Sequence, residues 1–172
     1  NRVVVGGRMN GSTLSLRRLL VEADDLRIET SGRVTFADPH EVALEVDWQW
    51  RSPEAMEFAG ALALEGDRRR YNLRHTLSSP LAVATNGNVT GVPLDPVFEL
   101  RNEWESLTWP VGGYPLQAGA GSLEFTGKPT EYSIVLDTIA SWQDIPETAV
   151  SLAASGDLES LAVTRLQMNP AQ

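Results

Sequence analysis

A strict alternation of apolar and polar residues between His40 and Trp50 constrains this chain more than any other feature. The apolar positions are Val42, Leu44, Val46, Trp48 and Trp50, and the positions between them are Ala43, Glu45, Asp47 and Gln49. Successive side chains of a β-strand point to opposite faces, so this segment is typical of a strand with one apolar and one mostly polar face.

The same period of two recurs along the chain. Its apolar positions are Leu62 and Leu64, Tyr71, Leu73 and Leu77, Phe98 and Leu100, Leu123 and Phe125, Tyr132, Ile134 and Leu136, Val150 and Leu152, and Leu161 and Val163. Shorter candidate strands lie near Val3 to Val5, Leu14 to Leu16 and Leu26 to Phe36. After Val163 the phase shifts to Leu166 and Met168, which predicts a β-bulge.

Turn signals separate these segments. They are Gly6-Gly7, Asp38-Pro39, Gly66-Asp67, Asn86-Gly87, Gly112-Gly113, Gly127-Lys128-Pro129 and Gly156-Asp157. Helical spacing is weak, although Leu14 to Ala23 and Ser52 to Ala61 could each be short helices. The pattern predicts an antiparallel, nearly all-β fold.

A faint internal repeat is also present. Gly60, Leu62, Gly66, Tyr71 and Leu73 align with Gly121, Leu123, Gly127, Tyr132 and Ile134 at a constant offset, since 121 − 60 = 61 and 132 − 71 = 61. The hairpin repeats cover residues 60–91 and 121–168. Repeated hairpins with one apolar face favour an elongated sheet in which each unit contacts mainly its neighbours. We therefore expect residues 1–172 to form one such segment.

Composition excludes several classes of protein. The chain has 172 residues, a net charge of -9 and no cysteine, which excludes a disulfide scaffold, a cysteine-ligated zinc site and a thiol nucleophile. The acidic balance argues against nucleic-acid binding, which needs clustered lysine and arginine. No stretch approaches the roughly 18–20 apolar residues of a membrane helix, and no signal segment opens the chain. We expect a soluble piece of a longer protein, with any anchor outside it.

Residues with catalytic potential do not form a recognisable motif. The two histidines are His40 and His75, and His75 shares the strand face of Tyr71 and Leu73. There is no Gly-x-Ser-x-Gly elbow, metal-ligand spacing or phosphate loop. The carboxylates mostly alternate with apolar residues, as on a solvated strand face; they are Asp24, Asp25, Glu41, Glu45, Asp47, Glu103, Glu105, Asp144 and Glu147. We predict that the protein is not an enzyme and needs no metal or cofactor.

Five tryptophans leave three interpretations open. Trp48, Trp50, Trp104, Trp109 and Trp142 suit the core of a sheet. Exposed rings could instead stack on sugars in a carbohydrate-binding β-sandwich. Together with the aliphatic residues, they could also line an apolar groove for an acyl chain.

The second half of the chain resembles a known family. The similar segments are Leu107-Thr108-Trp109-Pro110, Gly121-Ser122-Leu123-Glu124-Phe125-Thr126-Gly127, Glu131-Tyr132-Ser133-Ile134, Asp144-Ile145-Pro146 and Gly156-Asp157-Leu158-Glu159-Ser160-Leu161-Ala162-Val163. Their order resembles the TamB family, the inner-membrane subunits of the translocation and assembly module, in a middle segment before the C-terminal domain.

The resemblance implies a fold and a function. TamB-like proteins belong with the AsmA-like bridge-type lipid transporters, are anchored in the inner membrane of Gram-negative bacteria, and extend through the periplasm. They partner TamA, an Omp85-family barrel. Their β-taco fold is a long antiparallel sheet curved into a U-shaped trough with an apolar interior. The implied function is shielding of phospholipid acyl chains during transport between the two membranes, in support of outer-membrane protein assembly.

The apolar alternation then predicts the lining of the lipid groove. The predicted residues are Val42, Leu44, Val46, Trp48, Trp50, Leu62, Leu64, Tyr71, Leu73, Leu77, Phe98, Leu100, Leu123, Phe125, Tyr132, Ile134, Leu136, Val150, Leu152, Leu161 and Val163. Two alternatives stay open: a chaperone-like groove that binds β-strands of outer-membrane protein clients, and the carbohydrate-binding sandwich.

Overall fold

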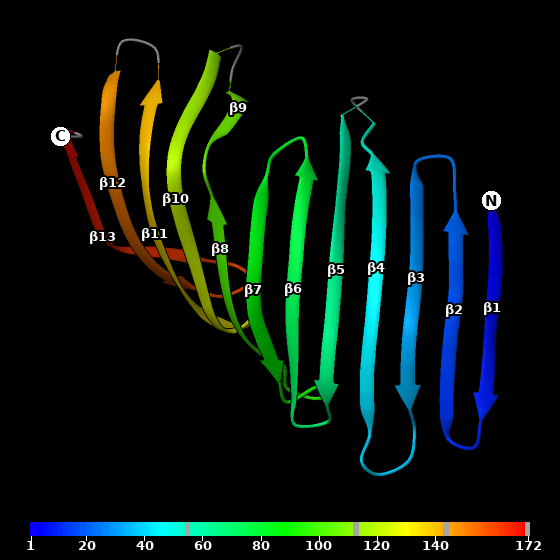
Figure 1. The fold of residues 1–172 in the computed structure, drawn as a ribbon. Helices are drawn as coiled ribbons and strands as arrows, with labels where there is room; N and C mark the ends of the chain where they lie inside the picture. The colour runs from blue at the N-terminus through cyan, green and yellow to red at the C-terminus, as the bar shows by residue number, and fades with distance from the viewer. Residues whose placement is uncertain (54–55, 112–113, 143–144, 171–172) are drawn as a thin grey trace.

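The fold is an uninterrupted series of antiparallel strands (Figure 1). The structure, a computed structural model, describes residues 1–53, 56–111, 114–142 and 145–170, with the side chains of 109–116, 142 and 145 excepted. The strands are β1 (Arg2–Asn10), β2 (Thr13–Glu22), β3 (Leu26–Thr35), β4 (Glu41–Arg51), β5 (Glu57–Asp67), β6 (Arg70–Ser79), β7 (Val83–Thr90), β8 (Val97–Trp104), β9 (Leu107–Val111), β10 (Tyr114–Lys128), β11 (Glu131–Trp142), β12 (Ile145–Gly156) and β13 (Leu161–Pro170).

All thirteen strands belong to one sheet. Twelve follow one another in sequence order, from β1 to β8 and from β10 to β13, and β9 pairs with the far part of β10. The all-β prediction is confirmed. The two helical alternatives are wrong, because Leu14 to Glu22 lie in β2 and Glu57 to Ala61 lie in β5. The described ranges contain no helix with the length and apolarity needed to cross a membrane.

Most turn signals lie at hairpin ends, but Gly6-Gly7 and Asn86-Gly87 do not. Gly6 and Gly7 lie inside β1 at a register shift, and Gly87 lies inside β7 opposite Leu73. The backbone of β8 approaches Gly87 so closely that a Cβ there would overlap the carbonyl oxygen of Glu99. Glycine at these positions permits a bulge or a close strand approach rather than a turn. Gly112-Gly113 lies outside the described residues.

The pairing register changes at one point within several strand pairs. One separates Ala153 from Ala154 in β12, opposite the segment of β13 between Val163 and Arg165. It returns Leu166 to the face that carries Leu152, so the bulge predicted from the phase shift is confirmed. Such bulges bend a strand and increase its twist.

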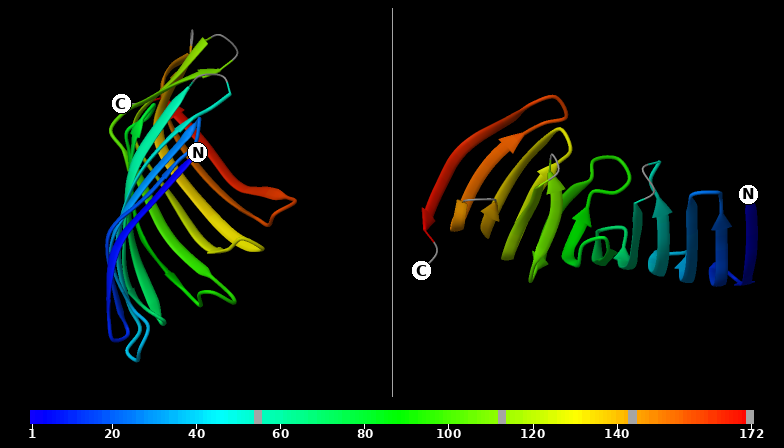
Figure 2. Two further views of the ribbon diagram at one scale, coloured as in Figure 1. Left: turned by 90° about the vertical axis from the view of Figure 1, so that its right-hand side faces the viewer. Right: turned by 90° about the horizontal axis from the view of Figure 1, so that it is seen from above.

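The sheet is a single curved layer (Figure 2). Its strands bend along their length toward the far side of the view in Figure 1, and the C-terminal strands curl most. Within the described residues only Leu20, Val89 and Ala154 are buried hydrophobic residues, and no large side chain is fully enclosed. The two-layer sandwich considered for a carbohydrate-binding protein is therefore wrong.

Candidate functional site

One face of the sheet carries a continuous apolar surface, here called the apolar face. Residues that are directly opposite in antiparallel strands share a face, so the pairing registers define its rows. One row runs Leu44, Leu64, Leu73, Gly87, Leu100, Phe125, Ile134, Ala154, Val163. All twenty-one residues predicted from the alternation lie on this face.

The apolar face is wider than the prediction. It also includes Val3, Val5 and Met9 of β1, Leu14, Leu16, Leu19 and Val21 of β2, Leu26, Ile28 and Val34 of β3, Phe58, Val83, Val89, Trp104, Ala154, Leu166 and Met168. The register shift between Leu16 and Leu19 breaks the alternation in β2. A sequence search that allows the apolar positions of a strand to change once from even to odd numbers would have found the residues of β2.

The apolar face is only half buried. In β4 and β6 its residues from Val42 to Trp48 and from Tyr71 to Leu77 are partly buried, whereas the residues between them are exposed. On the edge strands the same face is open, with Val5 67% and Met168 58% exposed. The described chain thus leaves an extended apolar surface uncovered, which in soluble proteins marks a binding site.

Aromatic rings pack across the strands of the apolar face. Phe125 stacks on Tyr132 at 5.2 Å and meets the edge of Phe98 at 6.4 Å, and Trp50 stacks on Phe58 at 5.2 Å. The Tyr132 hydroxyl donates to the carbonyl oxygen of Asp157 at 3.1 Å. These contacts hold neighbouring hairpins together where no second layer covers them. The side chains of Trp109 and Trp142 lie outside the described part.

The internal repeat places two tryptophans over glycines. Trp48 lies opposite Gly60, and Trp104 lies opposite Gly121. A Cβ on Gly60 would come within 2.9 Å of the Trp48 ring, and one on Gly121 within 2.6 Å of the Trp104 ring. Each glycine therefore makes room for an indole to lie flat across its strand.

The two units differ at the position that holds His75 in the first unit. Trp48 Nε1 donates to His75 Nε2 at 3.2 Å, and the two rings lie nearly parallel, at 10°, with their centroids 5.8 Å apart. His75 lies opposite Leu62, and the equivalent residue opposite Leu123 is Leu136, at the same offset of 136 − 75 = 61. Leucine offers no acceptor, and Trp104 Nε1 is buried with no hydrogen-bond partner among the described residues.

This difference predicts that replacing tryptophan by phenylalanine lowers the free energy of unfolding by different amounts at the two positions. Trp48→Phe removes the hydrogen bond to His75, so we expect the free energy of unfolding to fall by about 1–2 kcal/mol more than in Trp104→Phe, which removes a donor that has no partner. Urea unfolding of both variants measures the difference. Equal losses would contradict the pairing.

Three polar residues interrupt the apolar face in its central strands. His75 of β6, Thr85 of β7 and Asn102 of β8 are successive cross-strand neighbours, here called the polar row. Thr85 Oγ1 donates to Asn102 Oδ1 at 2.8 Å, and Asn102 Nδ2 donates to the carbonyl oxygen of Leu123 at 3.1 Å. The alternation analysis placed His75 on this face but missed Thr85 and Asn102, which are polar at positions where the pattern expects apolar residues.

Burial lowers the pKa of His75 below its ordinary value of 6.5. The unfolded chain then binds the proton more readily than the folded chain, so His75 favours folding above about pH 6.5. This contribution is lost progressively as the pH falls from there toward the folded-state pKa. Protonation would also remove the acceptor of the Trp48 indole.

We therefore expect the wild type to lose stability between pH 8 and pH 5.5, and His75→Gln to lose less over the same range. Urea unfolding at both values measures the difference. Lowered carboxylate pKa values, as at Asp67 and Asp157, act below this range because their ordinary value is 3.8. An identical slope in both proteins would exclude the histidine as the cause.

The opposite face is charged and faces water. Arg18 pairs with Glu29 at 2.8 Å, and Arg101 pairs with Glu103 and Glu124 at 2.8 and 2.5 Å. The candidate carboxylates Glu45, Asp47 and Glu103 lie on this face, in line with the expected solvated surface. The described residues hold no group of three or more His, Asp or Glu side chains that could bind a metal.

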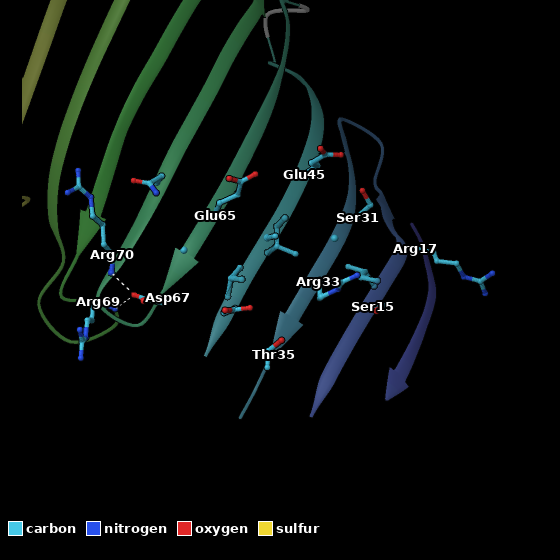
Figure 3. A pocket seen from close by; sticks show the side chains of 18 residues that line it. Ser15, Arg17, Ser31, Arg33, Thr35, Glu45, Glu65, Asp67, Arg69 and Arg70 are labelled. Atoms are coloured by element: carbon cyan, nitrogen blue, oxygen red, sulfur yellow. Dashed lines mark hydrogen bonds between the residues drawn. The ribbon is translucent and has the colours of Figure 1, made fainter. Parts of the chain in front are cut away.

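A hollow of about 1080 Å³ lies on this charged face over β2 to β6 (Figure 3). Its ionic lining consists of Arg17, Arg33, Arg69, Arg70, Glu41, Glu45, Glu65 and Asp67. Four cations and four carboxylates leave no net charge that would select an ion. The Asp67 carboxylate accepts the backbone N–H groups of Arg69 and Arg70, which lowers its pKa and closes the β5–β6 turn.

The figures show which face is concave. Figure 3 has the N-terminal strands on the right and the β4–β5 connection at the top, as in Figure 1, and it presents Glu45, Glu65 and Arg33 on the viewer's side. The sheet bends away from that side (Figure 2). The charged face is therefore convex, and the apolar face lines the concave side.

An open, single-layer β-sheet with an apolar concave face places the chain among all-β proteins built as a curved trough. The model of the family described as TamB, N-terminal domain, matches residues 1–172. The chain belongs to the TamB family. No solved structure matches it. TamB proteins are transport or bridge proteins of the Gram-negative envelope.

Proposed function

We propose that the apolar face shields phospholipid acyl chains during transport between the inner and outer membranes. The observation that carries this proposal is the continuity of the apolar face over twelve strands with nothing covering it in the described chain. Acyl chains need no donors or acceptors, and burying one methylene contributes about 0.8 kcal/mol. A few strands can therefore hold a chain without a closed pocket.

The proposal includes the cellular setting. The chain is one β-taco segment of a longer periplasmic protein that is anchored in the inner membrane. That protein cooperates with TamA in the outer membrane and supports outer-membrane protein assembly. Membership of the TamB family supports this setting. The convex charged face keeps the outside of the trough in water, where the acidic balance of the chain disfavours flat binding to an anionic membrane.

Site-specific photocrosslinking tests the proposal. Crosslinkers at Val46 and Phe125, on the concave face, should capture phospholipid in cells. Crosslinkers at the neighbouring positions Glu45 and Glu124, on the convex face, should not. Capture at the glutamate positions alone would overturn the assignment of faces, and capture at none of the four would overturn the lipid function.

A second function is favoured by the two open edges of the sheet. Within the described chain, β1 and β13 each pair with one neighbour only. An open edge offers backbone groups to which an extended client segment could add as a strand. A chaperone function for outer-membrane protein clients predicts that an unfolded β-barrel peptide competes with lipid for crosslinking at Phe125.

A further inference from the structure

The polar row divides a level of the trough that is apolar on both sides of it in β4, β5, β10 and β11. On the β5 side its neighbour is Leu62, and on the β10 side its neighbour is Leu123. Both belong to the apolar face, which continues through Val46 in one direction and Leu136 in the other. The row lies in β6, β7 and β8, in the middle of the sheet (Figure 1). An acyl lipid that lies along this level of the trough therefore covers or contacts the polar row.

Most polar atoms of the row are satisfied within the chain. The Thr85 hydroxyl donates to the Asn102 side chain, which donates in turn to Leu123. Thr85 is only 9% exposed, so this part of the row is fixed and needs no ligand. The His75 ring differs, because only one of its two nitrogens has a partner among the described residues.

The Trp48 indole determines which nitrogen of His75 is free. It donates to Nε2, so Nε2 is unprotonated and the neutral ring carries its hydrogen on Nδ1. Nδ1 has no acceptor among the described residues and, unlike the Trp104 indole nitrogen, is not buried. The hydrogen bond from the nearly parallel Trp48 ring, 5.8 Å away between centroids, orients the imidazole. His75 thus presents one oriented N–H donor to the trough.

A ligand that covers this donor must replace its water. An alkyl chain has no acceptor and would leave the N–H unpaired, which is unfavourable. The polar groups of a diacyl phospholipid nearest to its chains are the ester carbonyl groups. We propose that His75 Nδ1–H donates a hydrogen bond to an ester carbonyl oxygen of the bound lipid, so that the polar row seats the ester region and the chains extend over the flanking leucines. This inference rests on the proposed lipid function.

Competition between ester- and ether-linked lipids tests the inference. The protein containing residues 1–172 is incubated with vesicles of equal parts of a diester and a diether phosphatidylglycerol with the same sixteen-carbon chains, and the captured lipids are counted by mass spectrometry. We expect the wild type to enrich the diester about 2- to 10-fold, the range that one net hydrogen bond gives. His75→Leu should capture both lipids equally, and Leu73→Ala, which changes the same strand and face without removing a donor, should keep the enrichment.

The outcomes separate the inference from the proposed function. Equal capture by the wild type, or enrichment that persists in His75→Leu, overturns the role of His75 but leaves the lipid function intact. Capture of neither lipid by the wild type overturns the lipid function. Since His75→Leu also removes the partner of Trp48, ¹⁵N NMR of the wild type provides a second measurement. The His75 Nδ1–H signal should shift on addition of the diester lipid and not of the diether lipid, and equal responses would overturn the inference.

Discussion

Leu123→Asp is expected to reduce lipid capture by about two orders of magnitude or more. Leu123 is half buried in the centre of the apolar face, between Asn102 and Leu136. A carboxylate covered by an acyl chain loses its hydrating water, and the least unfavourable response is that it binds a proton and becomes neutral. At pH 7 this costs about 4 kcal/mol against a usual aspartate pKa near 3.9. Lipid capture from vesicles measures the loss.

Two control variants separate charge on the apolar face from general damage. Thr126→Asp places the same charge on the exposed convex face of the same strand, and we expect it to keep wild-type capture. Leu123→Asn has nearly the same shape as Leu123→Asp without the charge, so its loss should be smaller. Equal capture by Leu123→Asp and the wild type would contradict a role of this face in holding lipid. Leu44→Asp, on the other side of the polar row, is expected to behave like Leu123→Asp.

The second large effect concerns the backbone rather than the ligand. Gly32 of β3 has a φ of +138°, and a Cβ at this position would overlap the carbonyl oxygen of Ala43 in β4. Alanine would strain the backbone and also push the two strands apart. We expect Gly32→Ala to lower the free energy of unfolding by about 3 kcal/mol or more.

Gly119→Ala is the matched control. Gly119 also lies within a strand, but the nearest atom to a new Cβ is Ile139 Cβ at 3.5 Å, an ordinary contact. Removal of the glycine flexibility should leave the free energy of unfolding unchanged or raise it by up to about 1 kcal/mol. Urea unfolding of both variants measures the contrast, and similar values would show that β3 and β4 can separate at little cost.

The alternation in the sequence predicted the faces because it reports a local property. Val42 to Trp50 and Tyr71 to Leu77 each follow one strand without a bulge, so their period of two leads directly to one face. The face of β2 was harder to predict, because a register shift between Leu16 and Leu19 moves the later residues of this strand to the other parity. Asn86-Gly87 resembles a hairpin turn, but its role depends on how closely β8 approaches, and sequence spacing does not record that approach.

The polar row and the two tryptophan units depend on pairing between strands. His75, Thr85 and Asn102 are separated by at least ten residues in sequence, and only the hairpin registers place them side by side. Likewise the repeat of Gly60 at Gly121 was visible in the sequence, but the unpaired indole of Trp104 was not. The second unit has Leu136 where the first has the acceptor His75, and this equivalence appears only once the strand registers align the two units.

Because the strands of the main path pair with the strands next to them on that path, and only β10 pairs in addition with β9, the length of the trough can change in fixed steps. Neighbouring strands lie about 4.8 Å apart, so the twelve strands from β1 to β13 extend over roughly 50 Å along the trough, and one added hairpin would extend it by about 10 Å. No existing contact would have to change, since no strand is packed against a distant one. The length of such a sheet depends on the number of its hairpins, and a change in length requires no rearrangement of a hydrophobic core.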